Sequence, residues 1–336
     1  MSSRHWFAAV ALLTGSLAQA GDTLLNVSYD VARGFYKDFN PAFVADWQAK
    51  TGQAVKIEQS HGGSSKQARS VIDGLPADVV TMNNPLDIDA IADKAGLLPK
   101  DWASKLPHHA APSYSAILFV VRKGNPKGIK DWNDLVKPGV KVVIPNPKTS
   151  GNGRYSYLAA WEYGKRNSQV LGDSRDAVAR DFVAALFANV PVLDTGGRGA
   201  TTTFAQRGIG DVLLTFENEV RLIKDELGPD QFDVVIPSLT VRADNPVAVV
   251  EKVANKHGNA ALAKAYLEYH FSDAGQELIA KSELRPINAA VLQKYSATLP
   301  ALNLFTVESA FGSWPAAQKT HFADGGVFDQ IVSTGK

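Results

Sequence analysis

The chain is 336 residues long, lacks cysteine and carries 35 basic against 34 acidic residues. The absence of cysteine excludes disulfide bonds, so the stability of an exported chain of this composition must come from its core. The balanced charge argues against nucleic acid as a partner, because nucleic-acid binding needs a basic face. With 45% hydrophobic residues, the chain is long enough to build two domains.

The first twenty residues have the pattern of a secretory signal peptide. Arg4 and His5 give a weakly basic start, residues 6–13 are apolar, and Ala18-Gln19-Ala20 matches a cleavage site. The alternative is an uncleaved membrane anchor, although the apolar run is too short to span a bilayer. We expect cleavage after Ala20, which leaves 34 basic and 34 acidic residues. Since no cysteine follows, no lipid-anchored form is expected.

After this segment, short apolar runs alternate with amphipathic patterns, which indicates strands and helices in α/β layers. In the first part of the chain we expect strands at 24–28, 55–57 and 77–80 and helices at 33–50 and 66–72. The first of these helices carries aromatic residues at four-residue spacing: Phe35, Phe39, Phe43 and Trp47. This spacing is typical of a face that packs into a core, and cofactor stacking is the alternative.

A strongly apolar strand at 115–121 is interpreted as a crossover into a second domain. In that domain we expect a helix after Arg154 and strands at 140–145, 190–193, 211–215 and 232–237. A second crossover is expected near 238–250, followed by helical residues 259–280 in which Ser272 begins a second helix. The expected divisions are a first lobe at 21–121, a second lobe at 122–238 and a return segment at 239–336 that completes the first lobe.

A chain that leaves one α/β domain, builds another and returns leaves two or more strands between the domains. Such connections allow two domains to close on a ligand by hinge motion. In open α/β sheets, ligands bind beyond the carboxyl ends of the strands. The expected fold class is therefore α/β with two lobes and a ligand cleft between them.

Three turns rich in glycine, serine and threonine follow predicted strands, at residues 60–67, 146–154 and 195–203. A turn of small residues that opens a helix exposes backbone N–H groups at the positive end of the helix dipole, where anions bind. The histidines do not have the spacing of metal ligands, so no metal is expected. The three turns predict a protein that holds a small oxyanion without transforming it.

The sequence around these turns resembles the periplasmic sulfate- and thiosulfate-binding proteins, the solute receptors of ABC importers. The resemblance covers nearly the whole chain after residue 20 and is carried by segments 25–30, 59–68, 121–127, 146–154, 194–204, 208–213 and 311–315. It implies a type II periplasmic-binding-protein fold, a periplasmic location and sulfate or thiosulfate as the ligand. It also implies a membrane permease as partner, no cofactor and a monomer.

In sulfate-specific members of this family, main-chain N–H groups, one serine hydroxyl and one tryptophan indole donate to the anion. The resemblance implies that Ser150 is the hydroxyl donor. It also implies five main-chain N–H donors: Asp30, Ser64, Gly151, Asn152 and Gly197. Phe216 stands at the tryptophan position and has no N–H to donate. This departure is similar to the thiosulfate-binding branch of the family.

Gly63 and Arg198 are expected to support these donors without touching the anion. Gly63 would give its turn the required backbone shape, through a positive φ or a close approach, and Arg198 would order the third turn. Asp30 is expected to turn its N–H to the anion and its carboxylate to the start of its own helix, and helix capping alone is the alternative. Lys66 and Arg154 are expected to brace their turns or to be solvated.

A donor-only site suits sulfate and thiosulfate, which are dianions without a proton at neutral pH, and we expect its affinity to change little between about pH 5 and 8. Hydrogen phosphate would need an acceptor as well, whereas molybdate is also a donor-only ligand and stays an alternative. A secreted serine hydrolase using Ser64 or Ser150 is a third interpretation. It requires a histidine and an acid, and His61 beside Ser64 has no evident acid to orient it. We therefore expect no enzyme activity.

Overall fold

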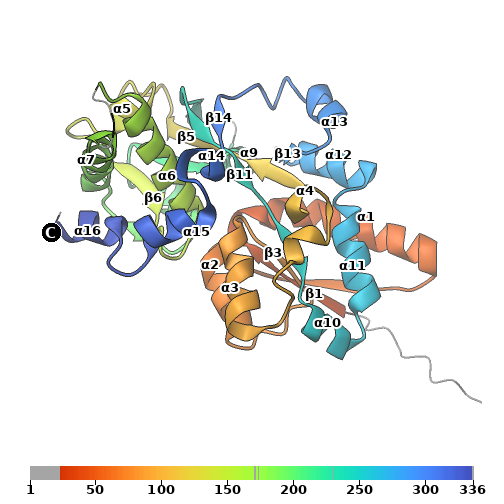
Figure 1. The fold of residues 1–336 in the computed structure, drawn as a ribbon. Coiled ribbons are helices and arrows are strands. Elements are labelled where there is room, and N and C mark those ends of the chain that lie inside the picture. Colours follow the sequence, from red (N-terminus) through yellow and green to blue (C-terminus); the bar gives the residue numbers. More distant parts are fainter. Residues whose placement is uncertain (1–22, 170–171, 173, 229, 335–336) are drawn as a thin grey trace, which may run out of the picture.

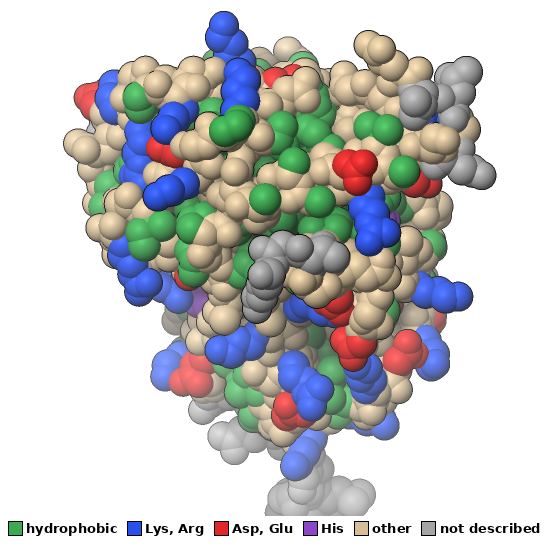
Figure 2. Space-filling model, turned by 90° about the vertical axis from the view of Figure 1, so that its left-hand side faces the viewer, with side chains coloured by type: hydrophobic (Ala, Val, Ile, Leu, Met, Phe, Trp, Pro, Cys, Tyr) green, Lys and Arg blue, Asp and Glu red, His purple; other side chains and the backbone are tan. Residues whose placement is uncertain are grey.

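The structure is a computed structural model that describes residues 23–169, 172, 174–228 and 230–334, and it forms two α/β lobes (Figure 1). The predicted signal peptide lies outside the described residues. Among those described, no helix is both long and apolar enough to span a membrane. On the face shown in Figure 2, Lys and Arg side chains lie among Asp and Glu side chains.

A four-stranded sheet in the order β12-β3-β1-β2 forms the centre of the first lobe. β1, β2 and β3 are parallel, and β12 runs antiparallel to β3. The strands span Thr23–Tyr29 (β1), Lys56–Gly62 (β2), Val79–Thr81 (β3) and Val247–Val249 (β12). Tyr29 pairs with Gly62 at the carboxyl ends of β1 and β2, so Asp30 and Gly63 both leave the sheet at the same edge.

Helices cover this sheet, and the predicted aromatic face of α1 packs into the core. Phe35, Phe39 and Phe43 are buried, and Phe39 lies 5.4 Å from the ring of Tyr266 and 4.0 Å from that of His270. The helical elements are η1 Asp30–Ala32, α1 Arg33–Thr51, α2 Ser64–Ile72, α3 Pro85–Ala95, η2 Trp102–Ser104, α4 Pro107–Ala110, α10 Glu251–His257, α11 Ala260–Tyr269, α12 Asp273–Lys281 and α13 Ala289–Lys294. Ser272 accepts from the Gly275 N–H, which confirms the predicted helix start.

The second lobe contains a five-stranded sheet in the order β7-β6-β8-β5-β9. β6 runs parallel to β7 and β8, whereas β5 is antiparallel to β8 and β9. The strands are β5 Ile117–Arg122, β6 Val142–Pro145, β7 Leu193–Asp194, β8 Val212–Phe216 and β9 Phe232–Val235, and the helices are α5 Trp132–Leu135, α6 Gly151–Arg166, α7 Ser174–Ala188, α8 Gly197–Thr201, η3 Thr202–Gln206 and α9 Glu217–Leu227. The second and third turns follow β6 and β7.

Three details of the predicted elements differ in the structure. The strand expected at 115–121 is divided at Ala116, because β4 Ser113–Ser115 pairs with β11 Ala243–Asp244 and β13 Arg285–Pro286, whereas β5 joins the second sheet. The helix expected after Arg154 begins before it, at Gly151. The strand expected at 190–193 is the two-residue β7, because only its end pairs with β6.

The segment 304–334 packs mainly against the second lobe, although Trp314–Ala317 (α15) also contacts α3 of the first lobe. β14 Leu304–Phe305 pairs with β10 Thr240–Val241, and the helical elements α14 Val307–Phe311, α15 Trp314–Ala317, η4 Gln318–Phe322 and α16 Val327–Thr334 follow (Figure 1). Phe328 packs edge-on against Tyr157 of α6 and Phe187 of α7. This apolar contact places α16 on the second lobe, whereas the sequence assigned residues 239–336 to the return to the first lobe. The predicted domain boundaries stay predictions.

Candidate functional site

Three helices begin at the three predicted turns. α2 begins after Gly63, α6 after Ser150 and α8 after Gly196, and in none of them does the preceding residue cap the helix with a side-chain hydrogen bond. The first N–H groups of a helix have no acceptor within it. The N–H groups of Ser64, Gly151 and Gly197 therefore lie at positive helix ends, where an anion is favoured.

The three turns meet at Gly63, where the two lobes touch. A Cβ atom at Gly63 would lie 2.5 Å from the carbonyl oxygen of Thr195 and 2.7 Å from that of Thr149. A Cβ atom at Gly196 would lie 3.2 Å from the Gly63 nitrogen. Neither glycine needs a positive φ, since φ is −55° at Gly63 and −162° at Gly196. Glycine is required here by close approach, and the backbones of both lobes come together at one place.

Hydrogen bonds hold the second and third turns to each other. The Thr149 hydroxyl donates to the Thr195 carbonyl at 3.0 Å, and the Asn146 N–H donates to the Asp194 carbonyl at 2.7 Å. Ser150 is 1% exposed, and its hydroxyl does not cap α6. This hydroxyl therefore lies in the buried region between the lobes, beside the first amides of α6.

Asn152 is anchored through its side chain. Its Nδ2 donates to the Thr215 hydroxyl at 3.2 Å, and its Oδ1 accepts from the Ser156 hydroxyl at 3.2 Å. Both ends of the side-chain amide are thus engaged inside the second lobe. The role of its backbone N–H toward an anion stays a prediction.

The carboxylate of Asp30 interacts with the backbone at the start of its own helix η1, since Val31 is among the groups that lower its pKa. It also reaches the second lobe, which was not expected from the sequence: Asp30 Oδ2 accepts a hydrogen bond from the backbone N–H of Arg198, in the first turn of α8, at 3.1 Å. Burial raises the pKa of Asp30, and the Arg198 N–H partly offsets this effect. The closed arrangement of the lobes therefore brings a first-lobe carboxylate to a second-lobe helix start.

The guanidinium of Arg198 is held by α9. It contacts Glu219 at 2.8 Å and Glu226 at 2.8 Å. Thr201 donates to the same Glu219 oxygen at 2.7 Å. Glu219 is fully buried, and this burial raises its pKa to about 7, although Arg198 partly offsets the effect. Arg198 thus braces the third turn from behind.

Phe216 lies at the carboxyl end of β8, between aromatic residues of both lobes. Its buried ring is edge-on to Tyr29, which precedes Asp30, at 6.2 Å, and to Tyr155 of α6 at 6.0 Å. Tyr155 in turn packs on Trp314 at 5.1 Å. Phe216 therefore presents an apolar ring beside the start of η1 and the first turns of α6.

Sequence reasoning missed the loop after β3, which faces the second turn. A Cβ atom at Gly151 would collide with the Asn83 side chain, and the Asn83 N–H donates to the Ser64 hydroxyl at 3.4 Å. Asn84 caps α3 by accepting from the Asp87 N–H. The Asn-Asn-Pro segment at 83–85 was an available signal, since Asn followed by proline at the first helical position marks a helix start.

Arg154 is not solvated, and it does more than brace its own turn. It is buried, its Nε donates to the Pro147 carbonyl at 3.1 Å, and its Nη1 lies 3.4 Å from Asp87 of the first lobe. This ion pair between α6 and α3 was not predicted, because nothing in the sequence relates residues so far apart.

His61 does not form a catalytic arrangement with a serine among the described residues. Its Nδ1 is buried without a hydrogen-bond partner there, and burial lowers its pKa to about 4. The Ser64 hydroxyl is instead within hydrogen-bond distance of the Asn83 N–H. In the part of the chain that the structure describes, no group of three or more His, Asp or Glu residues could hold a metal ion.

The structure brings together the loops that carry the predicted donors, namely Asp30, Ser64, Ser150, Gly151, Asn152 and Gly197, and places Gly63, Arg198 and Phe216 around them. Their roles toward an anion stay predictions. Two further groups border the donors: the Asp30 carboxylate and the loop at 83–87.

Comparison with known proteins gives concordant results. The family model of the bacterial extracellular solute-binding proteins matches residues 30–283. The chain is 58% identical to the thiosulfate-binding protein of Pseudomonas aeruginosa, over 97% of this chain and 96% of that protein. It is 52% identical to the sulfate-binding protein of Escherichia coli, over 95% and 96%.

Among solved structures, the sulfate-binding protein SubI from Mycobacterium tuberculosis H37Rv superposes with a TM-score of 0.79 at 32% identity, covering 88% of this chain and 98% of that one. A periplasmic thiamin-binding protein superposes with a TM-score of 0.63 at 19% identity, covering 92% and 96%, which shows a shared fold alone. The model match, the relatives and the two-lobed α/β fold agree. The chain therefore belongs to the bacterial extracellular solute-binding proteins.

Proposed function

We propose that this protein captures thiosulfate and sulfate in the periplasm and delivers them to the membrane permease of an ABC importer. The observation that carries the proposal is the meeting at Gly63 of three helix starts whose preceding residues provide no side-chain cap. Its relatives named for thiosulfate and sulfate binding cover nearly the whole chain and support the choice of ligand. The pattern of residues 1–20 supports export followed by cleavage.

The chemistry of the site suits a dianion without protons. Backbone N–H groups of Asp30, Ser64, Gly151, Asn152 and Gly197 supply donors, and the Ser150 hydroxyl supplies another. Sulfate and thiosulfate can accept from all of them and need to donate to none. Charge-assisted hydrogen bonds of this kind contribute about 1.5–3 kcal/mol each before the costs of association.

The neighbouring cations are engaged elsewhere, so the anion is stabilised by dipoles. Arg198 is held by Glu219 and Glu226, and Arg154 by Asp87 and the Pro147 carbonyl. A charge compensated by several fixed dipoles does not require a buried counter-ion. Because both lobes supply donors, the anion receives all of its hydrogen bonds only when the lobes are closed. The ligand would therefore stabilise the closed state.

Calorimetric titration of residues 21–336 with sulfate, thiosulfate, molybdate and phosphate tests this function. We expect sulfate and thiosulfate to bind far more tightly than phosphate, because the proton of hydrogen phosphate lacks a free acceptor. Tighter binding of molybdate than of both sulfur anions would contradict the proposed ligand. Tight phosphate binding at pH 7 would show that the Asp30 carboxylate faces the ligand.

We propose further that Ser64 and Ser150 bind the ligand and do not act as nucleophiles. The absence of a hydrogen bond between His61 and either serine among the described residues supports this. Incubation with a serine-reactive phosphonate tests it, with trypsin as the positive control. We expect no covalent adduct on this protein, and an adduct on either serine would indicate a hydrolase.

A further inference from the structure

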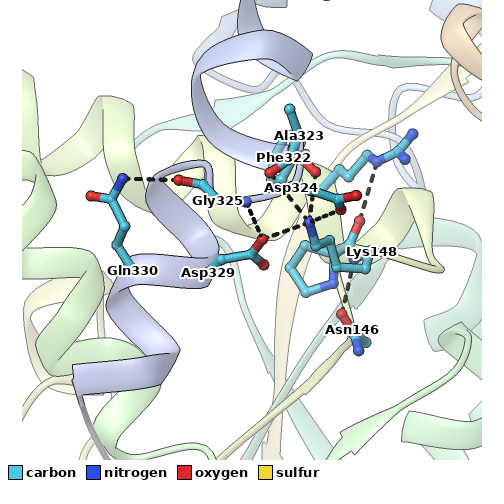
Figure 3. A network of polar contacts seen from close by, with 10 residues as sticks. Asn146, Lys148, Phe322, Ala323, Asp324, Gly325, Asp329 and Gln330 are labelled. Carbon is cyan, nitrogen blue, oxygen red and sulfur yellow. Dashed lines mark hydrogen bonds and ion pairs between the residues drawn. The ribbon is translucent and has the colours of Figure 1, made fainter.

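Lys148, in the second turn, is bound by residues of the C-terminal segment. Lys148 Nζ lies 3.0 Å from the carbonyl oxygen of Phe322 and 3.3 Å from that of Ala323 (Figure 3). It also lies 3.3 Å from Asp324 Oδ1 and 2.9 Å from Asp329 Oδ2. Four oxygens from the end of η4, the connecting loop and the first turn of α16 therefore surround this ammonium group.

Asp329, one of the two aspartates that pair with Lys148, is itself held in place by hydrogen bonds. Asp329 Oδ2 accepts from the backbone N–H of Gly325 at 2.8 Å, and Gln330 Nε2 donates to the Gly325 carbonyl at 2.9 Å (Figure 3). The hydrogen bond with Lys148 lowers the pKa of Asp329, which keeps it ionised at neutral pH. Residues 323–329, the loop and the first turn of α16, thus form a preformed binding site for the lysine, and α16 packs on α7 through Phe328.

Hydrogen bonds within the turn connect Lys148 to Ser150. Asn146 Oδ1 accepts from the Lys148 N–H at 2.9 Å, and the Asn146 carbonyl accepts from the Thr149 and Ser150 N–H groups at 3.1 and 2.9 Å. Two peptide bonds separate Lys148 from Ser150, and both following amides are tied to Asn146. A displacement of Lys148 must therefore shift the Ser150 hydroxyl.

We propose that Lys148 is a positioning residue, by which the C-terminal segment sets the place of the Ser150 hydroxyl in the anion site. The inference rests on the proposed function and extends it. The charge of Lys148 is balanced by Asp324, Asp329 and two carbonyls, so it does not serve as the counter-ion of the anion. The C-terminal segment thereby becomes part of the binding machinery although it contributes no donor.

The test compares Lys148→Met and Asp329→Asn with Lys123→Met as the matched control. Lys123 also forms a lysine–aspartate pair in the second lobe, with Asp233 at 3.0 Å, but away from the turns. We expect Lys148→Met to raise the Kd for sulfate about tenfold, the size of one lost hydrogen bond. Asp329→Asn should act in the same direction, and Lys123→Met should leave the Kd unchanged.

Two readouts separate positioning from a merely structural role. In a Ser150→Ala background, Lys148→Met should raise the Kd much less than in the wild type, because the hydroxyl it positions is gone. A lowered melting temperature with an unchanged Kd, or an equal rise of Kd in both backgrounds, overturns the proposal.

Hydrogen exchange of the ligand-free protein tests the same inference without an anion. Lys148→Met should speed exchange of the Thr149 and Ser150 amides, whose acceptor is Asn146, whereas Lys123→Met should not. Unchanged exchange at both amides overturns the positioning role. If the wild type binds neither sulfate nor thiosulfate, the proposed function fails, and the exchange rates still decide the role of Lys148.

Discussion

At the scale of single residues, Phe216 is where this chain offers a ring in place of an N–H donor. The ring lies edge-on to Tyr29 and Tyr155. The sulfur of thiosulfate is larger, more polarisable and a weaker acceptor than an oxygen, so it loses little beside a phenyl edge. In sulfate, by contrast, one oxygen would lack a hydrogen-bond donor.

Phe216→Trp should therefore shift the preference toward sulfate by about 1 kcal/mol, the net contribution of one hydrogen bond. Competitive titration of sulfate against thiosulfate on both proteins measures the ratio of the two affinities. Because Phe216 is fully buried, the larger indole will also cost stability, but a loss common to both anions cancels in that ratio. An unchanged ratio would place selectivity elsewhere, for example at Asn152 or Gly197.

Glu219 brings a pH dependence that the sequence did not suggest. Its pKa is raised to about 7 by burial, with Asp30 adding to the effect and Arg198 opposing it. In the unfolded chain the group loses its proton near its ordinary value of 4.5. Its contribution to stability is thus complete below that value and is lost as the pH rises through about 7. The loss is on the order of 3 kcal/mol.

Glu219→Gln should remove this loss, so the variant gains stability relative to the wild type as the pH rises from 5 to 8.5. Three histidines with lowered pKa act in the opposite direction in both proteins: His61, His270 and His321. Their effects cancel in the difference between the two free energies of unfolding. A difference that does not change with pH would contradict the assignment.

The same carboxyl group revises the expectation of pH-independent binding. A protonated Glu219 removes one negative charge from the neighbourhood of the third turn, so anion affinity should fall as the pH rises through about 7. Calorimetric titration with sulfate at pH 5.5 and 8.5 measures this, and Glu219→Gln should abolish the difference. Equal pH dependence in both proteins would assign it to another group, such as Asp30.

At the scale of elements, the approach of α2 to the second and third turns depends on glycine. Gly63→Ala places a methyl group against the carbonyl oxygens of Thr149 and Thr195. Both atoms belong to the opposite lobe, so the clash exists when the lobes are closed. We expect weaker sulfate binding, by about 1–3 kcal/mol, with little change in the melting temperature of the ligand-free protein.

Gly62→Ala is the control for this substitution, because a Cβ atom there meets only the flexible side chain of Gln67, at 3.3 Å. Its affinity should stay near that of the wild type. Equal losses in both variants would show that the effect arises within the first lobe and not from closure.

Helices and strands that depend on local sequence patterns were predicted well. The aromatic spacing of α1, the strands β1 and β8 and the cap at Ser272 follow from periodicity and helix-start chemistry, and all appear in the structure. The division of β4 from β5 at Ala116 could not be predicted, because it depends on which distant strands each half pairs with. The place of α14–α16 has the same cause: Phe328 finds its partners on α6 and α7.

The same distinction holds for the candidate site. A helix after each of the three turns could be predicted because small residues after a strand have a local meaning, although α2 and α6 begin earlier than expected, at Ser64 and Gly151. The bond from Arg198 to Asp30 and the pair of Arg154 with Asp87 join the two lobes, so no local signal reveals them. The bond of the Asp30 carboxylate to the second lobe was missed for this reason.

At the scale of the whole molecule, we propose that both lobes donate hydrogen bonds to one anion that is held by neutral groups. Asp30 and Ser64 belong to the first lobe, whereas Ser150, Asn152 and Gly197 belong to the second. Such a site is complete only when the lobes close. The lysine and arginine side chains near it are engaged with carboxylates and carbonyls, so none is needed as a counter-ion.

A crystal structure of the protein with selenate tests this claim most directly, because anomalous scattering from selenium locates the anion. The account predicts one peak within hydrogen-bond reach of the Ser64 and Gly197 amides and the Ser150 hydroxyl, with no lysine or arginine nitrogen in contact with the anion. A peak bound by one lobe alone, or paired with the Lys148, Arg154 or Arg198 side chain, would contradict it.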